Sequence, residues 1–102
     1  MAYEIVFSDN AREHLRALAA AQRKTVLEQI EAQLMHEPNV QTKNRKPMRS
    51  NPLASWELRI GDLRVYYDIQ NQPPVVFVLA IGVKDRSEVR IGGKPYLWDK
   101  PL

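Results

Sequence analysis

The spacing of apolar residues in the first third of the chain predicts one strand followed by two helices. Residues 3–7 place alternate apolar side chains on one face, which is typical of a short strand. Two segments, one after residue 10 and one from about Ala21 to Met35, repeat apolar residues at the spacing of an amphipathic helix. The alanine-rich join between them favours two helices in a tight antiparallel pair, and one bent helix is the alternative.

Polar residues and a proline mark the ends of these helices. Ser8, Asp9 and Asn10 are all residue types that cap helix N-termini, and Asn10 with Glu13 three residues later resembles a capping box. Pro38 ends the second helix, because a proline ring clashes with the preceding helical turn.

Three strands are predicted in the second half of the chain. Residues 56–60 and 63–69 alternate, and Gly61-Asp62 between them suits a two-residue type II′ hairpin turn. Residues 75–81 are apolar on both faces, as expected of a central strand. The order strand, helix, helix, strand, strand, strand predicts an α+β fold, in which two antiparallel helices pack on one face of a four-stranded, mostly antiparallel sheet.

A basic loop is expected at residues 39–54, where prolines and asparagines replace the apolar repeat. Loops of this length in compact domains are uncommon and often functional, and disorder is the competing interpretation. Its four cations are expected to contact a phosphate backbone. They are Lys43, Arg45, Lys46 and Arg49.

The hairpin itself brings two like charges together. A two-residue turn places Arg59 opposite Arg64 on the polar face of the strands, where the pair costs up to about 1 kcal/mol. An anion between the two guanidinium groups would relieve this repulsion. The alternatives are that both side chains point into water, or that Glu57 or Asp68 neutralises them diagonally.

Further basic residues follow the central strand and extend this surface. Lys84, Arg86 and Arg90 lie within nine residues of its end, and Tyr66 on the polar face of the hairpin offers a ring on which a base can stack. A concave cationic surface of this kind suits nucleic acid.

Composition narrows the class of protein. The 102 residues suit one domain, residues 1–102, and their net charge is +3. There is no cysteine, which excludes disulfides, thiolate metal sites and cysteine nucleophiles. The longest apolar run, Val75 to Ile81, is far shorter than the about 20 residues that cross a membrane, and the N-terminus lacks signal-peptide features. We therefore expect a cytoplasmic protein with no membrane partner.

The two histidines and the C-terminal tail are interpreted as structural. His14 is expected on the solvated side of the first helix, and His36 at the end of the second, so their separation offers no metal site. Glu57 is interpreted as a surface glutamate, with general base as the other possibility. Gly92-Gly93 is expected to be a hinge into an apolar tail, residues 91–102, that packs on the domain or meets a partner.

Two segments resemble a known family. Residues 56–67 resemble the W-x-L-R-x-G-x-x-R-V-x-Y hairpin of RelE/ParE toxins, and residues 82–89 are similar to the G-x-[KR]-x-R-x-E-V segment of RelE-like members. The order of elements is also the family's, and the resemblance covers residues 3–90. It implies a type II toxin–antitoxin toxin with a cognate antitoxin as partner, and it implies metal-independent cleavage of mRNA on the ribosome, with no cofactor.

The resemblance also assigns roles to individual residues. Arg64 matches the hairpin arginine that holds the phosphate, Lys84 matches a second cation, and Arg59 and Arg90 complete the predicted catalytic set. Arg86 is the next cation of the second motif and is expected to bind RNA. Its place in the motif also allows a structural role through Glu88.

The sequence departs from the family pattern in two places. Arg90 stands where RelE-like enzymes often have a tyrosine, and arginine does not release a proton near neutral pH. Glu57 stands in a strand that is lysine-rich in RelE. Tyr66 or Tyr96 would have to replace the missing acid. These departures leave two alternatives open: a ParE-like inhibitor of DNA gyrase that binds without catalysis, and a non-toxic homologue that only binds an antitoxin.

Overall fold

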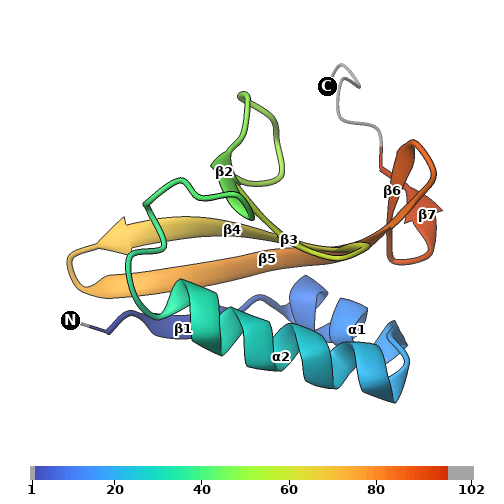
Figure 1. Ribbon diagram of the computed structural model, residues 1–102, viewed down its shortest axis with the longest axis horizontal. Helices are drawn as coiled ribbons and strands as arrows, with labels where there is room; N and C mark the ends of the chain where they lie inside the picture. Colours follow the sequence, from blue (N-terminus) through green and yellow to red (C-terminus); the bar gives the residue numbers. More distant parts are fainter. Residues whose placement is uncertain (1, 97–102) are drawn as a thin grey trace.

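Two helices cover one face of a twisted sheet in the computed structural model, which describes residues 2–96 (Figure 1). The elements, in chain order, are β1 (Glu4–Phe7), α1 (Asp9–Ala17), α2 (Ala20–Leu34), β2 (Arg45–Pro47), β3 (Trp56–Ile60), β4 (Leu63–Asn71), β5 (Pro74–Asp85), β6 (Glu88–Ile91) and β7 (Lys94–Pro95). The predicted α+β class and the pair of separate helices are confirmed. The sheet has seven strands among the described residues instead of the predicted four.

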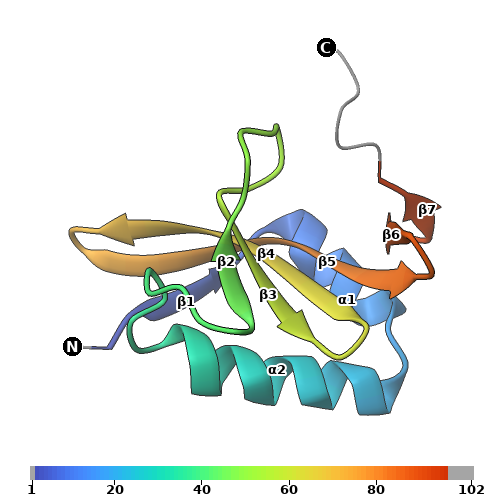
Figure 2. The ribbon, with the colours of Figure 1, turned by 45° about the horizontal axis from the view of Figure 1, so that its top comes forward.

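The strand β5 organises this sheet. The strands lie in the order β2-β3-β4-β5-β6-β7, and β1 pairs with β5 outside this path. β4 runs antiparallel along one edge of β5. On the other edge, β1 pairs in parallel with Val75–Val78, and β6 pairs antiparallel with Gly82–Asp85 (Figure 2). The long strand therefore has different neighbours along its two halves.

Three strands were missed because each lies in a segment that the sequence analysis treated as irregular. The expected loop, residues 39–54, contains β2, which pairs antiparallel with β3. β6 and β7 follow the central strand as further hairpins. Gly92-Gly93 forms the turn between them, because Ile91 pairs with Lys94 and both glycines have positive φ. The predicted hinge is therefore wrong, and the rest of the predicted tail, residues 97–102, lies outside the described residues.

The main core lies between the helices and the sheet. The helical spacing buries Val26, Ile30 and Leu34 of α2 completely or nearly so. They pack with the inward positions of the strands, including Leu58, Val65, Tyr67, Val76 and Val78. The Tyr67 hydroxyl donates a hydrogen bond of 3.0 Å to the Pro38 carbonyl, which ties the segment after α2 to the sheet.

The start of α1 completes the outer edge of β5 between β1 and β6. Ser8 is the N-cap, since its Oγ accepts a hydrogen bond from the Ala11 amide and donates one of 3.1 Å to the Leu79 carbonyl. The capping box predicted for Asn10 and Glu13 is wrong, and Glu13 instead pairs with Arg16.

His14 also belongs to this edge and is not the solvated residue that was predicted. Its Nδ1 accepts a hydrogen bond of 3.1 Å from the Ile81 amide of β5. A ring nitrogen accepts only when it carries no proton. Burial lowers the pKa of His14 below its ordinary value of 6.5, although the Glu13 carboxylate opposes this shift.

We predict that acid weakens the fold through His14. Because its pKa is lower in the folded state, the unfolded chain binds more protons below about pH 6.5. The contribution of His14 to the free energy of unfolding is then fully present above that pH, and it is lost as the pH falls through the folded-state pKa. Urea unfolding between pH 7.5 and 5.5 should show this loss for the natural protein and a flatter profile for His14→Gln. The control is His36→Gln at the exposed end of α2, and a slope unchanged by His14→Gln would contradict the assignment.

Candidate nucleic-acid interface on the open face of the sheet

The β3–β4 hairpin places its polar residues on the face of the sheet opposite the helices. Its predicted register is confirmed, with Ile60 opposite Leu63 and Arg59 opposite Arg64. Gly61 has a positive φ of 57°, and Asp62 does not have a positive φ. A type II′ turn requires this combination at its two central residues. We call the side of the sheet that carries Glu57, Arg59 and Arg64 the open face.

A buried carboxylate lies at the centre of this face. Glu57 is only 7% exposed. Its Oε1 lies 2.9 Å from Nε of Arg59 and 3.9 Å from Nζ of Lys46, which is directly opposite Glu57 on β2. Neutralisation of the two arginines by Glu57 was one of the alternatives, and it holds for Arg59, which Glu57 pairs with along the same strand and not diagonally. The interpretation of Glu57 as a surface glutamate is wrong.

Arg64 does not form an open clamp with Arg59. Its side chain is buried to 7% exposure, and Nη1 donates hydrogen bonds of 2.6 Å to the Gly61 carbonyl and 2.9 Å to the Leu63 carbonyl. These bonds brace the hairpin turn. The repulsion between the two arginines is therefore relieved by a carboxylate and by backbone oxygens of the protein itself.

Tyr66 is not available for base stacking, contrary to the prediction. It is 0% exposed and belongs to a second apolar cluster on the open face with Ala54 and Ala80. Burial raises its pKa far above the ordinary value of 10, and the neighbouring Glu57 carboxylate raises it further. A phenol that holds its proton this strongly is a weak acid, so Tyr66 is a poor replacement for the missing proton donor.

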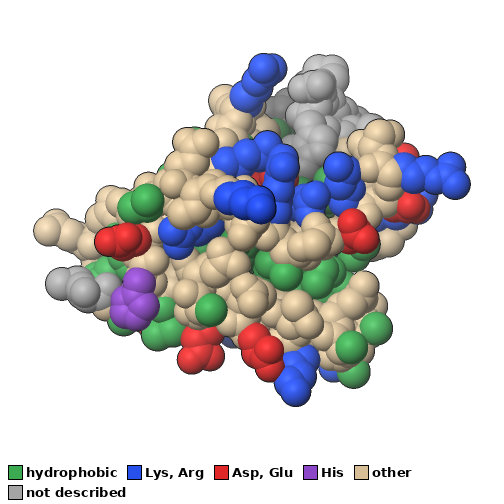
Figure 3. Space-filling view, viewed as in Figure 1, with side chains coloured by type: hydrophobic (Ala, Val, Ile, Leu, Met, Phe, Trp, Pro, Cys, Tyr) green, Lys and Arg blue, Asp and Glu red, His purple; other side chains and the backbone are tan. Residues whose placement is uncertain are grey.

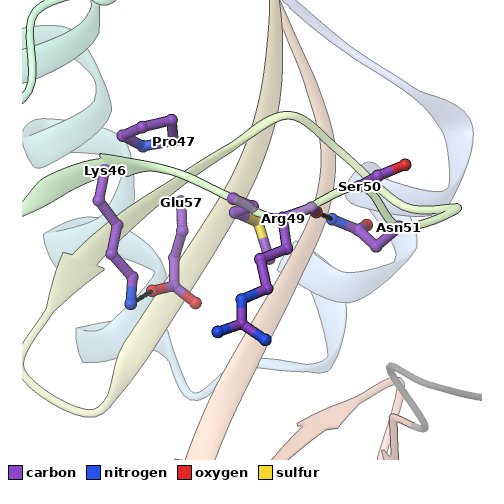
Figure 4. A pocket seen from close by; sticks show the side chains of 7 residues that line it. Lys46, Pro47, Arg49, Ser50, Asn51 and Glu57 are labelled. Carbon is purple, nitrogen blue, oxygen red and sulfur yellow. Dashed lines mark hydrogen bonds and ion pairs between the residues drawn. The ribbon is translucent and has the colours of Figure 1, made fainter.

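The loop between β2 and β3 forms a cleft above Glu57 (Figure 4). The cleft has a volume of about 410 Å³. Figure 4 shows the Lys46 ammonium on the Glu57 carboxylate and the Arg49 guanidinium extending beside them. Its lining residues are Lys46, Pro47, Met48, Arg49, Ser50, Asn51 and Glu57. Two of the four predicted loop cations thus line one cleft with a buried acid.

Asn51 holds this loop in shape. Its Nδ2 donates to the carbonyls of Arg49 and Ala54 at 2.7 and 2.9 Å. Its Oδ1 accepts from the amides of Leu53 and Ala54 at 2.8 and 3.0 Å. The competing interpretation of this segment as disordered is therefore not supported. Asparagine readily bonds to nearby backbone in turns, and this was a signal that the sequence analysis did not use.

The other two loop cations lie elsewhere. Arg45 is opposite Leu58 and so projects to the helix side, where its Nη1 donates to the Gln33 and His36 carbonyls at the end of α2. This contact satisfies carbonyls that a helix C-terminus leaves unpaired. Lys43 is exposed but does not line the cleft. The predicted RNA contact of Arg45 is therefore not supported by its position.

The second motif divides between the two faces. Lys84 is opposite Val89, whose side chain packs on the open face, and the Lys84 amide donates a hydrogen bond of 2.7 Å to the Asp62 carbonyl in the hairpin turn. Gly82 lies opposite Arg64, and a Cβ there would be 2.8 Å from a methyl carbon of Val89. The motif glycine thus makes room for the Val89 side chain of β6 against β5.

Arg86 and Arg90 do not join the cleft. Arg86 is exposed at the tip of the β5–β6 hairpin with a φ of 60°. Arg90 is opposite Val83, which packs on the helix-side core, so its side chain starts from the other face of the sheet. There it lies 3.0 Å from Glu88 and 3.7 Å from Asp85. Among the described residues, the ion pair of Glu88 is with Arg90 and not with Arg86.

Basic side chains nevertheless gather on the open face as a whole. Figure 3 shows most of the visible lysines and arginines above the sheet, with some carboxylates among them and others near α2. Among residues 2–96 no group of three histidine or carboxylate side chains could hold a metal ion. No described helix is long and apolar enough to cross a membrane.

Two solved structures with a similar fold are toxin–antitoxin complexes. The RelBE2 toxin–antitoxin complex from Mycobacterium tuberculosis has a chain that superposes with a TM-score of 0.72 at 25% sequence identity, covering 82% of this chain and 93% of that one. The archaeal RelE–RelB complex from Pyrococcus horikoshii gives a TM-score of 0.68 at 22% identity, covering 85% and 100%. At 22% identity, the similarity to the Pyrococcus structure supports only a shared fold. No protein of curated function matched the sequence.

A family model identifies the class. The model of the ParE toxin of type II toxin–antitoxin systems matches residues 5–88, which is most of the chain. The chain therefore belongs to this family and is a toxin of the RelE/ParE superfamily. The resemblance seen in the two sequence motifs is confirmed.

We predict that Asn51 is required for the shape of the cleft. Asn51→Ala removes four hydrogen bonds and should lower the free energy of unfolding by about 1–3 kcal/mol, given a net value of about 1 kcal/mol for each bond and partial replacement by water. Amides 53 and 54 should exchange with solvent faster. Ser50→Ala, in the same loop, is the control and should change stability by less than about 0.5 kcal/mol. Equal effects of the two substitutions would mean that the loop does not depend on Asn51.

Proposed function

We propose that this toxin cleaves mRNA on the ribosome and that the cleft above Glu57 is its active site. One observation carries the proposal: Glu57 is a buried carboxylate between Lys46 and Arg59, and it opens into a cleft that Arg49 also lines. Burying a charge is costly unless the charge is paired. A surface that only had to attract RNA would need no carboxylate, because a negative charge repels phosphate. An acid at this place is suited to moving a proton.

The reaction proposed for this cleft is an internal transfer at one phosphate. The 2′ oxygen attacks the neighbouring phosphorus, and Glu57 takes the proton of the 2′ hydroxyl. The bond from phosphorus to the 2′ oxygen forms, and the bond to the 5′ oxygen of the next nucleotide breaks. The leaving oxygen takes a proton from water, and Glu57 later returns its proton to solvent. The step requires no metal and no cofactor.

The cations around Glu57 would stabilise the negative charge that develops on the phosphate. Arg59 and Lys46 already contact the carboxylate, and both side chains are 46% exposed, so they are open to an incoming anion. When Glu57 accepts the proton it loses its charge, and the two cations are freed to bind the phosphate oxygens. The carboxylate thus keeps the cations in place until the reaction needs them.

Arg49 and Lys84 fit supporting roles, with Arg49 on the cleft wall and Lys84 beside the hairpin turn. Arg64 is proposed as a positioning residue that braces the turn through its two hydrogen bonds to backbone carbonyls. Its guanidinium also adds positive electrostatic potential to the open face. Lys43 and Arg86, both exposed, are proposed only as outer contacts to RNA or the ribosome. Arg90, paired with two carboxylates on the other face, is not part of this proposal.

A ParE-like inhibitor of DNA gyrase is the second candidate. The matched family model carries the ParE name, and Arg90 occupies the place of the tyrosine found in many RelE-like enzymes. Such an inhibitor would bind gyrase without chemistry at Glu57. For either target we propose a cognate antitoxin as partner, because both similar structures are complexes with one.

We predict that Glu57→Gln lowers the rate of mRNA cleavage by about 100- to 10,000-fold, the usual contribution of a general base. The amide keeps the shape and the hydrogen-bond acceptor but takes up no proton. The measurement is cleavage of a defined mRNA in a purified translation system, with products mapped by primer extension. Glu88→Gln, which changes an exposed carboxylate on the other side of the sheet, should leave the rate within about twofold, since surface changes are usually small.

The same proteins tested on DNA gyrase separate the two candidates. Intact mRNA together with inhibition of supercoiling by the natural toxin would reject the cleavage mechanism. Full cleavage by a folded Glu57→Gln variant would keep the nuclease but remove Glu57 from it.

A further inference from the structure

Tyr66 lies directly beside the buried carboxylate of the cleft. Glu57 of β3 and Tyr66 of β4 are opposite each other in the hairpin. Residues paired in this way leave the same face of a sheet, with Cβ atoms about 4.5–5.5 Å apart. Glu57 is 7% exposed and Tyr66 is 0% exposed. On the other side of Glu57, Lys46 of β2 is its cross-strand partner, so the carboxylate lies between a lysine and a phenol in one row across the sheet.

A bulge in β5 adapts the sheet to the Tyr66 side chain. The register of β4 against β5 shifts between Tyr66 and Tyr67. Leu79 is the extra residue of β5, and it packs with Ala80 in the cluster that contains Tyr66. Ser8, at the start of α1, holds the bulge by donating a hydrogen bond of 3.1 Å to the Leu79 carbonyl. Bulges are frequent beside active sites, where they redirect a side chain, and this one brings two consecutive residues of β5 against Tyr66.

The carboxylate and the phenol also interact electrostatically. Burial raises the pKa of Tyr66, and Glu57 raises it further, both by its charge and by accepting a hydrogen bond from this side chain. The phenol therefore keeps its proton and is available as a donor. A carboxylate has room for about four hydrogen bonds. Lys46 and Arg59 both contact Oε1, so the hydroxyl can join them without displacing either cation.

The Tyr66 hydroxyl differs from the two cations in the bonds that it can form. Lysine and arginine only donate hydrogen bonds, whereas a phenol both donates and accepts. The hydroxyl can therefore donate to the ionised carboxylate, and it can accept from the carboxylic acid after Glu57 has taken the proton of the 2′ hydroxyl. Of these three neighbours of Glu57, Tyr66 is then the one that can bond to the carboxyl group in both of its protonation states.

We propose that Tyr66 is a positioning residue, whose hydroxyl holds the Glu57 carboxyl group in place before and after the proton transfer. It acts through Glu57 and touches neither the phosphate nor the 2′ oxygen, because its side chain is fully buried. Figure 4 shows the carboxylate that it holds, on the side where Lys46 contacts it. The inference deepens the function proposed above and rests on it.

Tyr66→Phe tests this role, because it removes the hydroxyl and keeps the buried ring. Tyr67→Phe is the matched control. Tyr67 is also 0% exposed, but it belongs to the helix-side core and its hydroxyl bonds to the Pro38 carbonyl. Circular dichroism and thermal unfolding check that both variants fold. Cleavage of the defined mRNA is then measured over a range of substrate concentrations and from acidic to neutral pH.

We expect Tyr66→Phe to lower kcat by about tenfold or more, as for the loss of a hydrogen bond to a charged group, and to change KM by less than about twofold. The acid limb of the pH–rate profile should move to higher pH, because the ionised carboxylate loses a donor. Tyr67→Phe should leave this limb in place and kcat within about twofold. In the Glu57→Gln background, Tyr66→Phe should have no further effect on kcat, since the two residues act as a unit.

Other charged groups around this pair are considered in reading the profile. Asp68 lies two residues beyond Tyr66 on β4 and accepts a hydrogen bond of 2.7 Å from the Ser55 amide. Asp68→Asn should leave the acid limb in place, which separates its titration from that of Glu57. Lysine and arginine stay charged from acidic to neutral pH. Those that face the pair from β2, β3, β4 and the loop are Lys46, Arg49, Arg59 and Arg64.

Two results would overturn the inference and leave the proposed function intact. One is a natural kcat with an unmoved acid limb in folded Tyr66→Phe. The other is an equal effect of Tyr66→Phe in the natural and Glu57→Gln backgrounds. Absence of mRNA cleavage by the natural toxin, or full cleavage by Glu57→Gln, would instead remove the proposed function and this inference with it.

A measurement on the natural protein decides the question if Tyr66→Phe does not fold. The hydroxyl proton of Tyr66 is observed by nuclear magnetic resonance in the natural protein and in Glu57→Gln. Slow exchange with solvent and a chemical shift that changes in Glu57→Gln would support the hydrogen bond to the carboxylate. A hydroxyl proton with the same shift and exchange rate in both proteins would contradict it.

Discussion

The twelve-residue strand β5 is the element on which most of the sheet is assembled, because β1, β4 and β6 all pair with it. β4 runs along one of its edges, and the other edge pairs with β1 over one half and with β6 over the other. Between those partners its backbone would be left unpaired, and Ser8 and His14 of the α1 region fill the gap. Buried backbone groups must find partners, so this requirement also determines where α1 lies against the sheet.

Alternation along the strands then separates two surfaces with different chemistry. One face of β3 and β4 gives Leu58, Val65 and Tyr67 to the core, and the other gives Glu57, Arg59 and Arg64 to the open face. A strand cannot exchange one set for the other without losing its core. The open face is thus free to hold charges that contribute little to stability, while α2 and β1 leave an apolar groove on the opposite side.

The sequence predicted the parts of this arrangement that depend on local patterns. The hairpin register followed from Gly61-Asp62 and the alternation around it, and the helices followed from their apolar spacing. The short strand β2 was not predicted, because its three residues, one of them a proline, show no recognisable alternation of apolar and polar side chains. Without β2 opposite β3, nothing indicated that Lys46 would meet Glu57 or that Arg45 would turn to the helix end. The burial of Tyr66 was missed for a related reason, since Met48, Leu53 and Ala54 of the same segment cover it.

The burial of Glu57 has a cost that the proposed role in proton transfer would account for. Replacing a buried ion pair by apolar residues is often neutral or stabilising, so the pair between Glu57 and Arg59 is weak evidence of a structural need. The neighbouring cluster around Ala54, Tyr66 and Ala80 already provides apolar contacts on this face. A cationic surface for RNA or for an acidic protein would also gain positive potential without the carboxylate. Removing Glu57 alone would, however, leave Lys46, Arg59 and Arg64 to repel one another on this face, so the carboxylate has a structural role beside the role in proton transfer proposed for it.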